Sequence, residues 1–119
     1  YGGNLMACAA ALAPIEVIEE ESLLEHVSTV GAFFMKRMEQ MKLDHPIIGD
    51  VKGKGFLLGI ELVKDKKTKE PFPEAGVAVY QKAFRKGLAW IPAGHILRMS
   101  PPLIIEDAIT ETEKEFGYR

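Results

Sequence analysis

The chain has 119 residues, of which 47% are hydrophobic and 27% charged, and a formal net charge of −2. This length and composition are typical of one globular domain and exclude a disordered chain. The charge argues against an electrostatic nucleic-acid-binding protein, which would carry a basic face or stripe. The lysines at 64–69 are interrupted by an aspartate and followed by a glutamate and two prolines, so we interpret them as a solvated turn.

The N-terminal segment predicts a helix that needs a partner. Asn4 is a good N-cap for a helix over 5–20, whose first half is apolar on all sides. One small domain offers few places to bury such a helix, so we expect residues 1–21 to dock on a missing large domain or a partner subunit. Pro14 should kink or break the helix. The apolar run is short, has no basic flank and continues into glutamates, which predicts neither a signal peptide nor a membrane span.

The start of the chain and its single cysteine suggest where the protein comes from. The sequence opens at Tyr1 without an initiator methionine, so we expect a fragment of a larger protein. Cys8 has no second cysteine with which to form an internal disulfide. It lies in an apolar run, which predicts a buried and unreactive thiol. This cysteine usage is consistent with a cytoplasmic protein.

Apolar residues at steps of three and four predict two amphipathic helices. The first spans 22–43 and begins with a Ser-x-x-Glu capping box. Its apolar face is formed by Leu23, Val27, Val30, Phe34, Met38 and Met41. The second spans 74–86 and ends at Gly87, with an apolar face formed by Val77, Tyr80 and Phe84. Glu106 and Asp107 favour a last helix, because carboxylates suit the positive end of a helix dipole.

Short apolar runs bounded by turn residues predict strands over 48–52, 56–63, 88–91 and 96–100. Together with the helices they predict an α+β domain with a small antiparallel or mixed sheet of about three to four short strands covered by helices. The glycines of Gly53-Lys54-Gly55 lead into a strand and not into a helix. We therefore interpret them as a tight turn and reject a dinucleotide site.

Few side chains indicate chemistry when they are considered alone. Gly2-Gly3-Asn4 opens a helix and has the shape of an anion site, although most helix starts bind only water or their own cap. The three histidines lack metal-ligand spacing, so no metal site is predicted. Arg98, flanked by apolar residues, leaves two interpretations open. It is an arginine on an edge strand that extends to solvent, or its guanidinium grips a carboxylate through two hydrogen bonds.

Three segments, in order, resemble the class III aminotransferases, the group of 4-aminobutyrate, ornithine, acetylornithine and omega-amino acid aminotransferases. Tyr1-Gly2-Gly3-Asn4 with the following Met-Ala-Cys-Ala-Ala-Ala-Leu resembles the family's [FY]-G-G-N-P-x-A-C-A-A-A-L. Residues 48–55 and 59–62 resemble I-G-D-V-R-G-x-G and G-I-E-L, and residues 96–103 resemble [IL]-[LI]-R-x-x-P-P-L. The resemblance covers nearly the whole chain and departs from the pattern at Leu5 and Pro14.

The resemblance implies the C-terminal small domain of an aspartate-aminotransferase-like fold, in a dimeric enzyme that uses pyridoxal 5'-phosphate. Arg98 matches the family arginine that holds the substrate carboxylate, while Tyr1, Gly2 and Gly3 would border the cofactor phosphate. The family's Schiff-base lysine lies upstream of these segments, so no catalytic residue is expected within this chain. Its implied partners are the large domain, a second subunit, and small amino acid and 2-oxo acid substrates, with no nucleic acid or membrane. The isolated chain is expected to be inactive and not to bind the cofactor.

Two other functions stay open at this stage. The first is a free-standing α+β binding or regulatory module. The second is a racemase or epimerase of the same family, which would use the cofactor to move a proton without exchanging the amine. Nothing in these residues separates that activity from transfer of an amino group from a donor such as 4-aminobutyrate to a 2-oxo acid.

Overall fold

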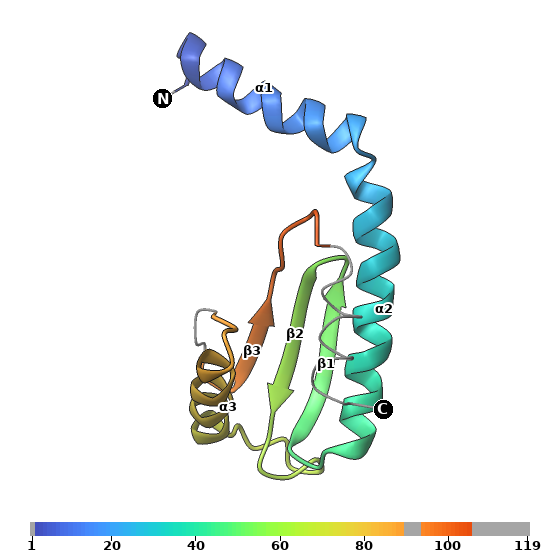
Figure 1. Ribbon diagram of the computed structural model, residues 1–119. Coiled ribbons are helices and arrows are strands. Elements are labelled where there is room, and N and C mark those ends of the chain that lie inside the picture. Colours follow the sequence, from blue (N-terminus) through green and yellow to red (C-terminus); the bar gives the residue numbers. More distant parts are fainter. Residues whose placement is uncertain (1, 90–93, 106–119) are drawn as a thin grey trace. The chain divides into compact units, whose positions relative to one another are not determined.

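The computed structural model describes residues 2–89 and 94–105 (Figure 1). Along these residues run the helices and strands α1 (Leu5–Glu20), α2 (Leu23–Asp44), β1 (Ile48–Lys54), β2 (Leu57–Leu62), α3 (Pro73–Arg85) and β3 (Ile96–Met99). This order confirms the predicted α+β class. The strand expected over 88–91 is not formed at Leu88 and Ala89, and its other two residues lie outside the described part, as does the helix expected after residue 105.

The described residues belong to two compact units. One contains residues up to His26 together with residues 101–105, and the other contains residues 27–100. In the first unit, α1 begins where the Asn4 side chain accepts hydrogen bonds from the backbone N–H groups of Met6 and Ala7, at 2.9 and 3.2 Å. This confirms the predicted N-cap. The helix continues through Pro14 up to Glu20, so of the expected kink or break, the break is wrong.

Two further expectations about the first unit are also wrong. Cys8 is exposed, because none of the residues of α1 is buried in the described structure. Ser22 has a φ of 51°, whereas the first residue of a capping box needs extended backbone. Its carbonyl oxygen still accepts hydrogen bonds from the N–H groups of Glu25 and His26, so α2 begins next to Ser22 without that motif.

The three strands of the second unit form an antiparallel sheet in the order β1-β2-β3. A two-residue turn at Gly55 and Phe56 joins β1 to β2, because Lys54 pairs with Leu57. Gly55 has a φ of 56°, which favours glycine. The glycine-rich segment is therefore the predicted tight turn, and the described strand that follows it excludes the strand–glycine–helix arrangement of a dinucleotide site.

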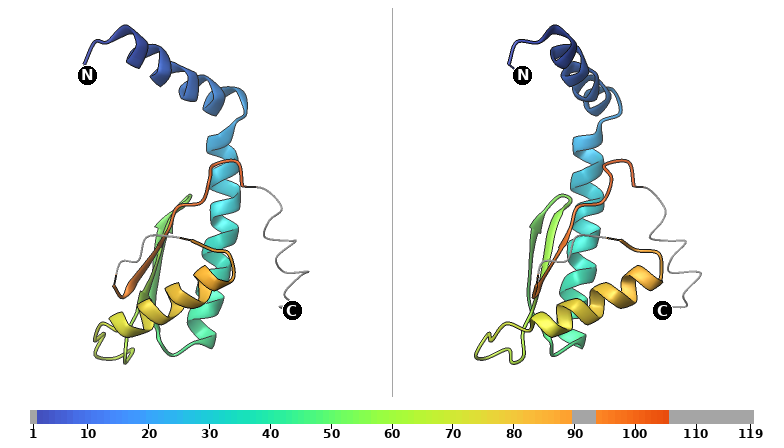
Figure 2. Two further views of the ribbon diagram at one scale, coloured as in Figure 1. Left: turned by 60° about the vertical axis from the view of Figure 1, so that its left-hand side comes forward. Right: turned by 90° about the vertical axis from the view of Figure 1, so that its left-hand side faces the viewer.

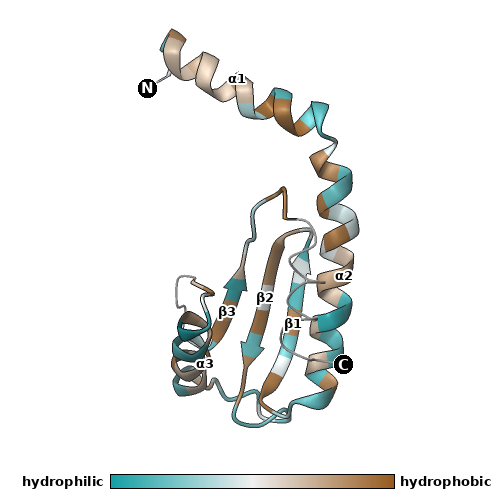
Figure 3. Cartoon of the chain, in the orientation of Figure 1, coloured by the Kyte–Doolittle hydropathy of each residue, from teal (hydrophilic) through white to brown (hydrophobic). Residues whose placement is uncertain are grey.

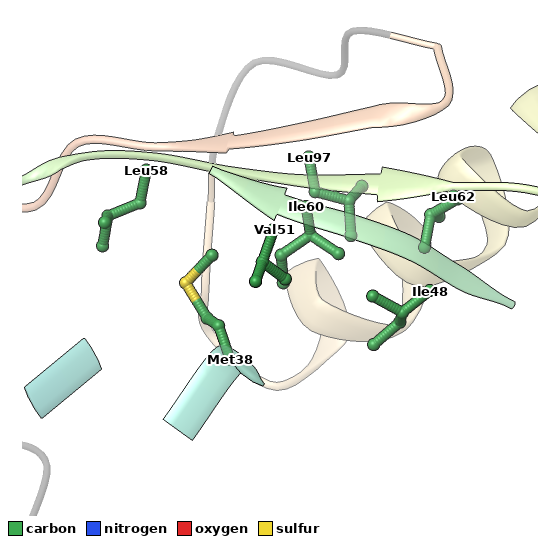
Figure 4. Packing of buried hydrophobic residues seen from close by; sticks show 7 residues of the cluster. All are labelled: Met38, Ile48, Val51, Leu58, Ile60, Leu62 and Leu97. Carbon is green, nitrogen blue, oxygen red and sulfur yellow. The ribbon is translucent and has the colours of Figure 1, made fainter. Parts of the chain in front are cut away.

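The core of the second unit lies between one face of the sheet and the two helices α2 and α3. Figure 4 shows the buried cluster, and Figure 2 shows the sheet nearly edge-on with α2 on one side of it. Phe34 and Met35 of α2 and Ala75 and Val79 of α3 pack against this cluster, which consists of Met38, Ile48, Val51, Leu58, Ile60, Leu62 and Leu97. The buried residues of β2, which are Leu58, Ile60 and Leu62, alternate along the strand, as expected for a sheet covered on one face.

The predicted apolar face is largely confirmed for α2 but not for α3. Leu23 and Met38 of α2 are buried as expected, but Met41 is 43% exposed. In α3 the predicted face is wrong, because Val77 and Phe84 are 49% and 58% exposed. Ala75 and Val79 of α3 pack against the core cluster instead, and Gly76 is buried against the backbone of Gly94. The close approach at Gly76 leaves no room for a side chain at that position.

Candidate functional site

The face of the sheet opposite the buried cluster carries the candidate site. Gly59 pairs with Lys52 of β1 and with Arg98 of β3, so these three residues form one row across the sheet. Directly paired residues of an antiparallel sheet project to the same face. Lys52 and Arg98 are exposed and Gly59 is half-buried. Because the neighbouring Val51, Ile60 and Leu97 point into the core, the row Lys52–Gly59–Arg98 lies on the open face.

Arg98 itself lies on β3, which is at the edge of the described sheet, and its side chain is exposed. Within the described residues its guanidinium makes no hydrogen bond or ion pair. Glu61 lies on the same face, in the next row, without forming an ion pair with Arg98 in this part of the chain. A guanidinium that meets no acceptor among the described residues is available to a carboxylate from elsewhere.

Backbone contacts fix the start of β3, and with it the place of Arg98. The carbonyl oxygen of His95 accepts a hydrogen bond of 2.8 Å from the N–H of Leu62, the last residue of β2. On the other side, a Cβ atom added to Gly76 would lie 1.9 Å from the carbonyl oxygen of Gly94. Gly76 was not singled out from the sequence, although a glycine inside a helical pattern is a signal for close packing.

One edge of the sheet is organised by charge around Asp50. Its carboxylate lies 2.9 Å from Lys42 Nζ of α2 and 3.3 Å from Lys52 Nζ, and it accepts a hydrogen bond from the N–H of Val51. The hydrogen bond from Lys42 lowers the pKa of Asp50 from 3.8 to about 2 and raises the pKa of Lys42. Lys52 thus shares its partner with a second lysine and is itself 74% exposed.

This charge arrangement predicts a dependence on acid. Because the pKa of Asp50 is lower in the folded state, its stabilising effect is present above about pH 4 and is lost as the pH falls towards 2. The substitution Lys42→Met is expected to move the midpoint of acid unfolding, followed by circular dichroism, to a higher pH. Lys36→Met, which removes an exposed lysine of the same helix, is the control. Equal shifts for both variants would contradict the role of the Asp50 pair.

The backbone of the two glycines before α1 is open on the side where a side chain would lie. Gly3 has a φ of 80°, and atoms added at the Cβ positions of Gly2 and Gly3 would meet nothing within 4 Å. Asn4 already satisfies the N–H groups of Met6 and Ala7, which removes two donors from the expected anion site. The open backbone of Gly2 and Gly3 fits the border of a phosphate site, but a complete site needs donors from outside this segment. Tyr1 lies outside the described residues.

Four of the described lysines have partners that do not favour a covalent attachment of pyridoxal phosphate. A lysine that forms a Schiff base needs a lowered pKa, which usually comes from burial or a neighbouring cation. Ion pairs with Asp50 and Glu70 instead raise the pKa values of Lys42 and Lys64. Lys66 and Lys69 donate hydrogen bonds to backbone carbonyl oxygens of Lys42 and Gly49. No metal-binding group of histidine, cysteine or carboxylate side chains exists in the described ranges.

Comparison with known proteins gives the family of the chain. The sequence profile for "Aminotransferase class-III" matches residues 1–115. The adenosylmethionine-8-amino-7-oxononanoate aminotransferase of Methanocaldococcus jannaschii is 43% identical over 99% of this chain and 25% of its own length. The isoleucine 2-epimerase of Lentilactobacillus buchneri is 49% identical over 87% of this chain and 23% of its own length. The chain therefore belongs to the class III aminotransferase family.

Solved structures agree with this family and with the fold. A Bacillus anthracis aminotransferase matches 97% of this chain and 27% of its own, with a TM-score of 0.80 and 39% identity. An amine transaminase from an uncultivated Pseudomonas species, in its PLP-bound form, matches 88% of this chain and 24% of its own, with a TM-score of 0.80 and 31% identity. Pyridoxal 5'-phosphate is thus the cofactor of the family, and this chain spans about a quarter of the relatives that it matches.

Proposed function

We propose that these residues work within a longer enzyme that transfers an amino group from an amino acid to a 2-oxo acid. The donor would include omega-amino acids such as 4-aminobutyrate, and Arg98 would hold a substrate carboxylate. The observation that carries this proposal is Arg98, exposed on the open face and without an acceptor among the described residues. The planar guanidinium matches a carboxylate through two parallel hydrogen bonds, which fixes the orientation of the substrate as well as its affinity.

The cofactor would be held mainly by residues outside this chain. Pyridoxal phosphate supplies an electron sink for the bonds at the amine-bearing carbon. From this chain, the backbone of Gly2 and Gly3 would border its phosphate, together with Tyr1. Because the described lysines are paired, hydrogen-bonded to the backbone or exposed, we infer that the chain by itself is inactive and does not retain the cofactor.

The exposed apolar surface of helix α1 indicates that this helix binds another domain or subunit. Its apolar side chains are exposed, among them Leu5 at 87%, Met6 at 82% and Leu12 at 57%. Figure 3 shows α1 pale over most of its first half, with both brown and teal residues after it. Exposed apolar surface of this extent indicates an interface. We infer that residues 1–21 dock on the large domain or on the partner subunit of a homodimer.

Two features of the chain bear on its place in the cell, the hydropathy of its helices and its single cysteine. No helix among the residues that the structure describes has the length and apolar character that a membrane crossing requires. The inference of a cytoplasmic enzyme depends on the cysteine usage, because the single Cys8 leaves the chain without an internal disulfide.

The proposal is tested by Arg98→Gln in the full-length enzyme. Loss of two charged hydrogen bonds, each contributing about 1.5–3 kcal/mol, predicts a fall of at least about 100-fold in kcat/KM for substrates that carry a carboxylate. Reaction with an amine that has no carboxylate, such as putrescine, is expected to change less than about twofold. Arg98→Lys keeps the charge but not the planar fork, so it should restore only part of the activity.

Lys54→Gln is the matched control for Arg98→Gln, because it removes one exposed cation from the same face. If Arg98→Gln leaves carboxylate substrates unaffected, or weakens putrescine equally, Arg98 does not hold the carboxylate. Activities are compared in single turnovers, in which the absorbance of the cofactor reports the donor half-reaction without an acceptor.

The relationship to an isoleucine 2-epimerase favours a second candidate, racemisation or epimerisation of an amino acid. Such an enzyme would also need Arg98 for the carboxylate, so the Arg98 variants do not separate the two activities. Incubation of the full-length enzyme with an L-amino acid in D₂O, without any 2-oxo acid, does separate them. Multiple-turnover formation of the α-deuterated D-epimer would establish a racemase or epimerase, while an absolute need for a 2-oxo acid would establish an aminotransferase.

A further inference from the structure

Gly59 lies in the middle of the central strand β2, on the open face of the sheet. A glycine weakens a strand, because it packs no side chain and loses more conformational freedom on folding than other residues. A glycine inside a strand therefore needs an explanation. Either the packing of the sheet requires it, or a ligand or another polypeptide approaches the sheet at this position.

The packing of the sheet does not need a glycine at this position. A Cβ atom at Gly59 would meet only Ile96 Cγ2 and the Lys52 carbonyl oxygen, both at 3.9 Å, which is ordinary van der Waals contact. Its φ is not in the region that favours glycine. The other two sheet glycines differ, since a Cβ at Gly49 would lie 2.6 Å from Val63 and one at Gly53 would lie 2.4 Å from the Leu57 carbonyl oxygen.

Gly59 lies directly beside Arg98 on the neighbouring strand. The two residues pair directly across β2 and β3, so a side chain at 59 would have its Cβ about 5 Å from that of Arg98. Lys52 is the direct neighbour on the other side of Gly59. The missing side chain therefore leaves a space in the open face that is bounded by two exposed cationic residues.

We propose that Gly59 is a specificity-determining residue that keeps open the space in which the carboxylate end of the substrate lies beside Arg98. This inference rests on the proposed function and extends it by a second residue of the same site. A carboxylate is the occupant that matches two flanking cations, one of which has no acceptor among the described residues. A side chain at position 59 would occupy this space without disturbing the sheet.

The test compares Gly59→Ala and Gly59→Val in the full-length holoenzyme. The valine variant is expected to raise KM for carboxylate substrates at least 10-fold, and the alanine variant is expected to raise it less. The rate of the reaction with putrescine should change by less than about twofold. The melting temperature and cofactor content should be unchanged or higher, because β-branched residues favour strands. Leu57→Val, two residues away on the same face and 74% exposed, is the control for a change of side chain that leaves the row of Arg98 untouched.

Arg98→Gln is measured in parallel, so that failure of this inference and failure of the proposed function can be distinguished. If Arg98→Gln raises KM for carboxylate substrates and Gly59→Val does not, the role of Gly59 is overturned while the function stands. If neither variant affects these substrates, the proposed function fails with it. A Gly59→Val enzyme that loses cofactor, melts earlier and is impaired with all substrates alike would show that polypeptide covers Gly59, which also overturns the inference.

Discussion

Substitution of Leu12 by glutamate in the full-length enzyme is expected to dissociate its subunits or detach its small domain, with loss of bound cofactor. Leu12 lies in α1, a helix with no buried residue in the described structure and with apolar side chains around its first half. If α1 docks on another domain or subunit, the glutamate places an unpaired charge in that interface. An uncompensated buried charge costs about 3–5 kcal/mol, which corresponds to an association weaker by roughly a hundredfold to several thousandfold.

Sedimentation velocity over a range of concentrations measures this dissociation, and the cofactor absorbance of the separated species measures its loss. Glu20→Lys, at the polar end of the same helix, is the control for a change of charge outside the apolar part. A Leu12→Glu enzyme that keeps the molecular mass, cofactor content and melting temperature of the parent would show that α1 remains exposed in the assembly. The docking of residues 1–21 would then be wrong.

The parts of the fold that could be predicted are those determined by local sequence. Asn4 caps α1 because a short side chain with an acceptor stands before an apolar helical run. The turn at Gly55 follows from a glycine placed between two segments with strand propensity. Gly87 ends α3 with a φ of 89°, as expected for a glycine after a helix. In each case the few residues that decide the structure lie next to each other in the chain.

The orientation of α3 could not be predicted, because it depends on a contact between distant segments. Periodicity correctly places Val77 and Phe84 on one face but does not say which face meets the sheet. The side that meets the sheet carries Ala75 and Val79. The choice is set by the close approach of Gly76 to Gly94, eighteen residues further along the chain. A hydrophobic stripe is thus evidence for a helix and weaker evidence for its buried side.

The candidate site was predictable only in part for the same reason. The apolar neighbours of Arg98 and its match to a family motif distinguish it in the sequence, but no local pattern could show that it has no partner among the described residues of the folded chain. Gly59 was visible as a glycine in an apolar run, and its meaning depends on the register that places it opposite Arg98. Strand register is a property of the assembled sheet, so the row Lys52–Gly59–Arg98 emerges only from the structure.

Substitution of Gly76 by alanine is expected to destabilise the small domain by about 1–3 kcal/mol, the typical cost of forcing an extra group into a packed core. Helix propensity alone predicts the opposite, since alanine favours a helix over glycine by about 1 kcal/mol. The close contact makes the substitution destabilising, because the added Cβ would lie 1.9 Å from the Gly94 carbonyl oxygen. The backbone at Gly94 must therefore move. The movement would affect His95 and the start of β3, three residues before Arg98.

Hydrogen–deuterium exchange in the full-length enzyme measures this effect locally. The N–H of Leu62 donates to the carbonyl oxygen of His95, so a shift of the 94–95 backbone should increase the exchange rate of peptides that contain Leu62. Ala78→Gly, at an exposed position of the same helix, is the matched control. Ala78→Gly lowers the helix propensity of α3 by about as much as Gly76→Ala raises it. It should increase exchange within α3 but not at Leu62. Unchanged or slower exchange at Leu62 in Gly76→Ala would mean that β3, and with it Arg98, is positioned without the contact between Gly76 and Gly94.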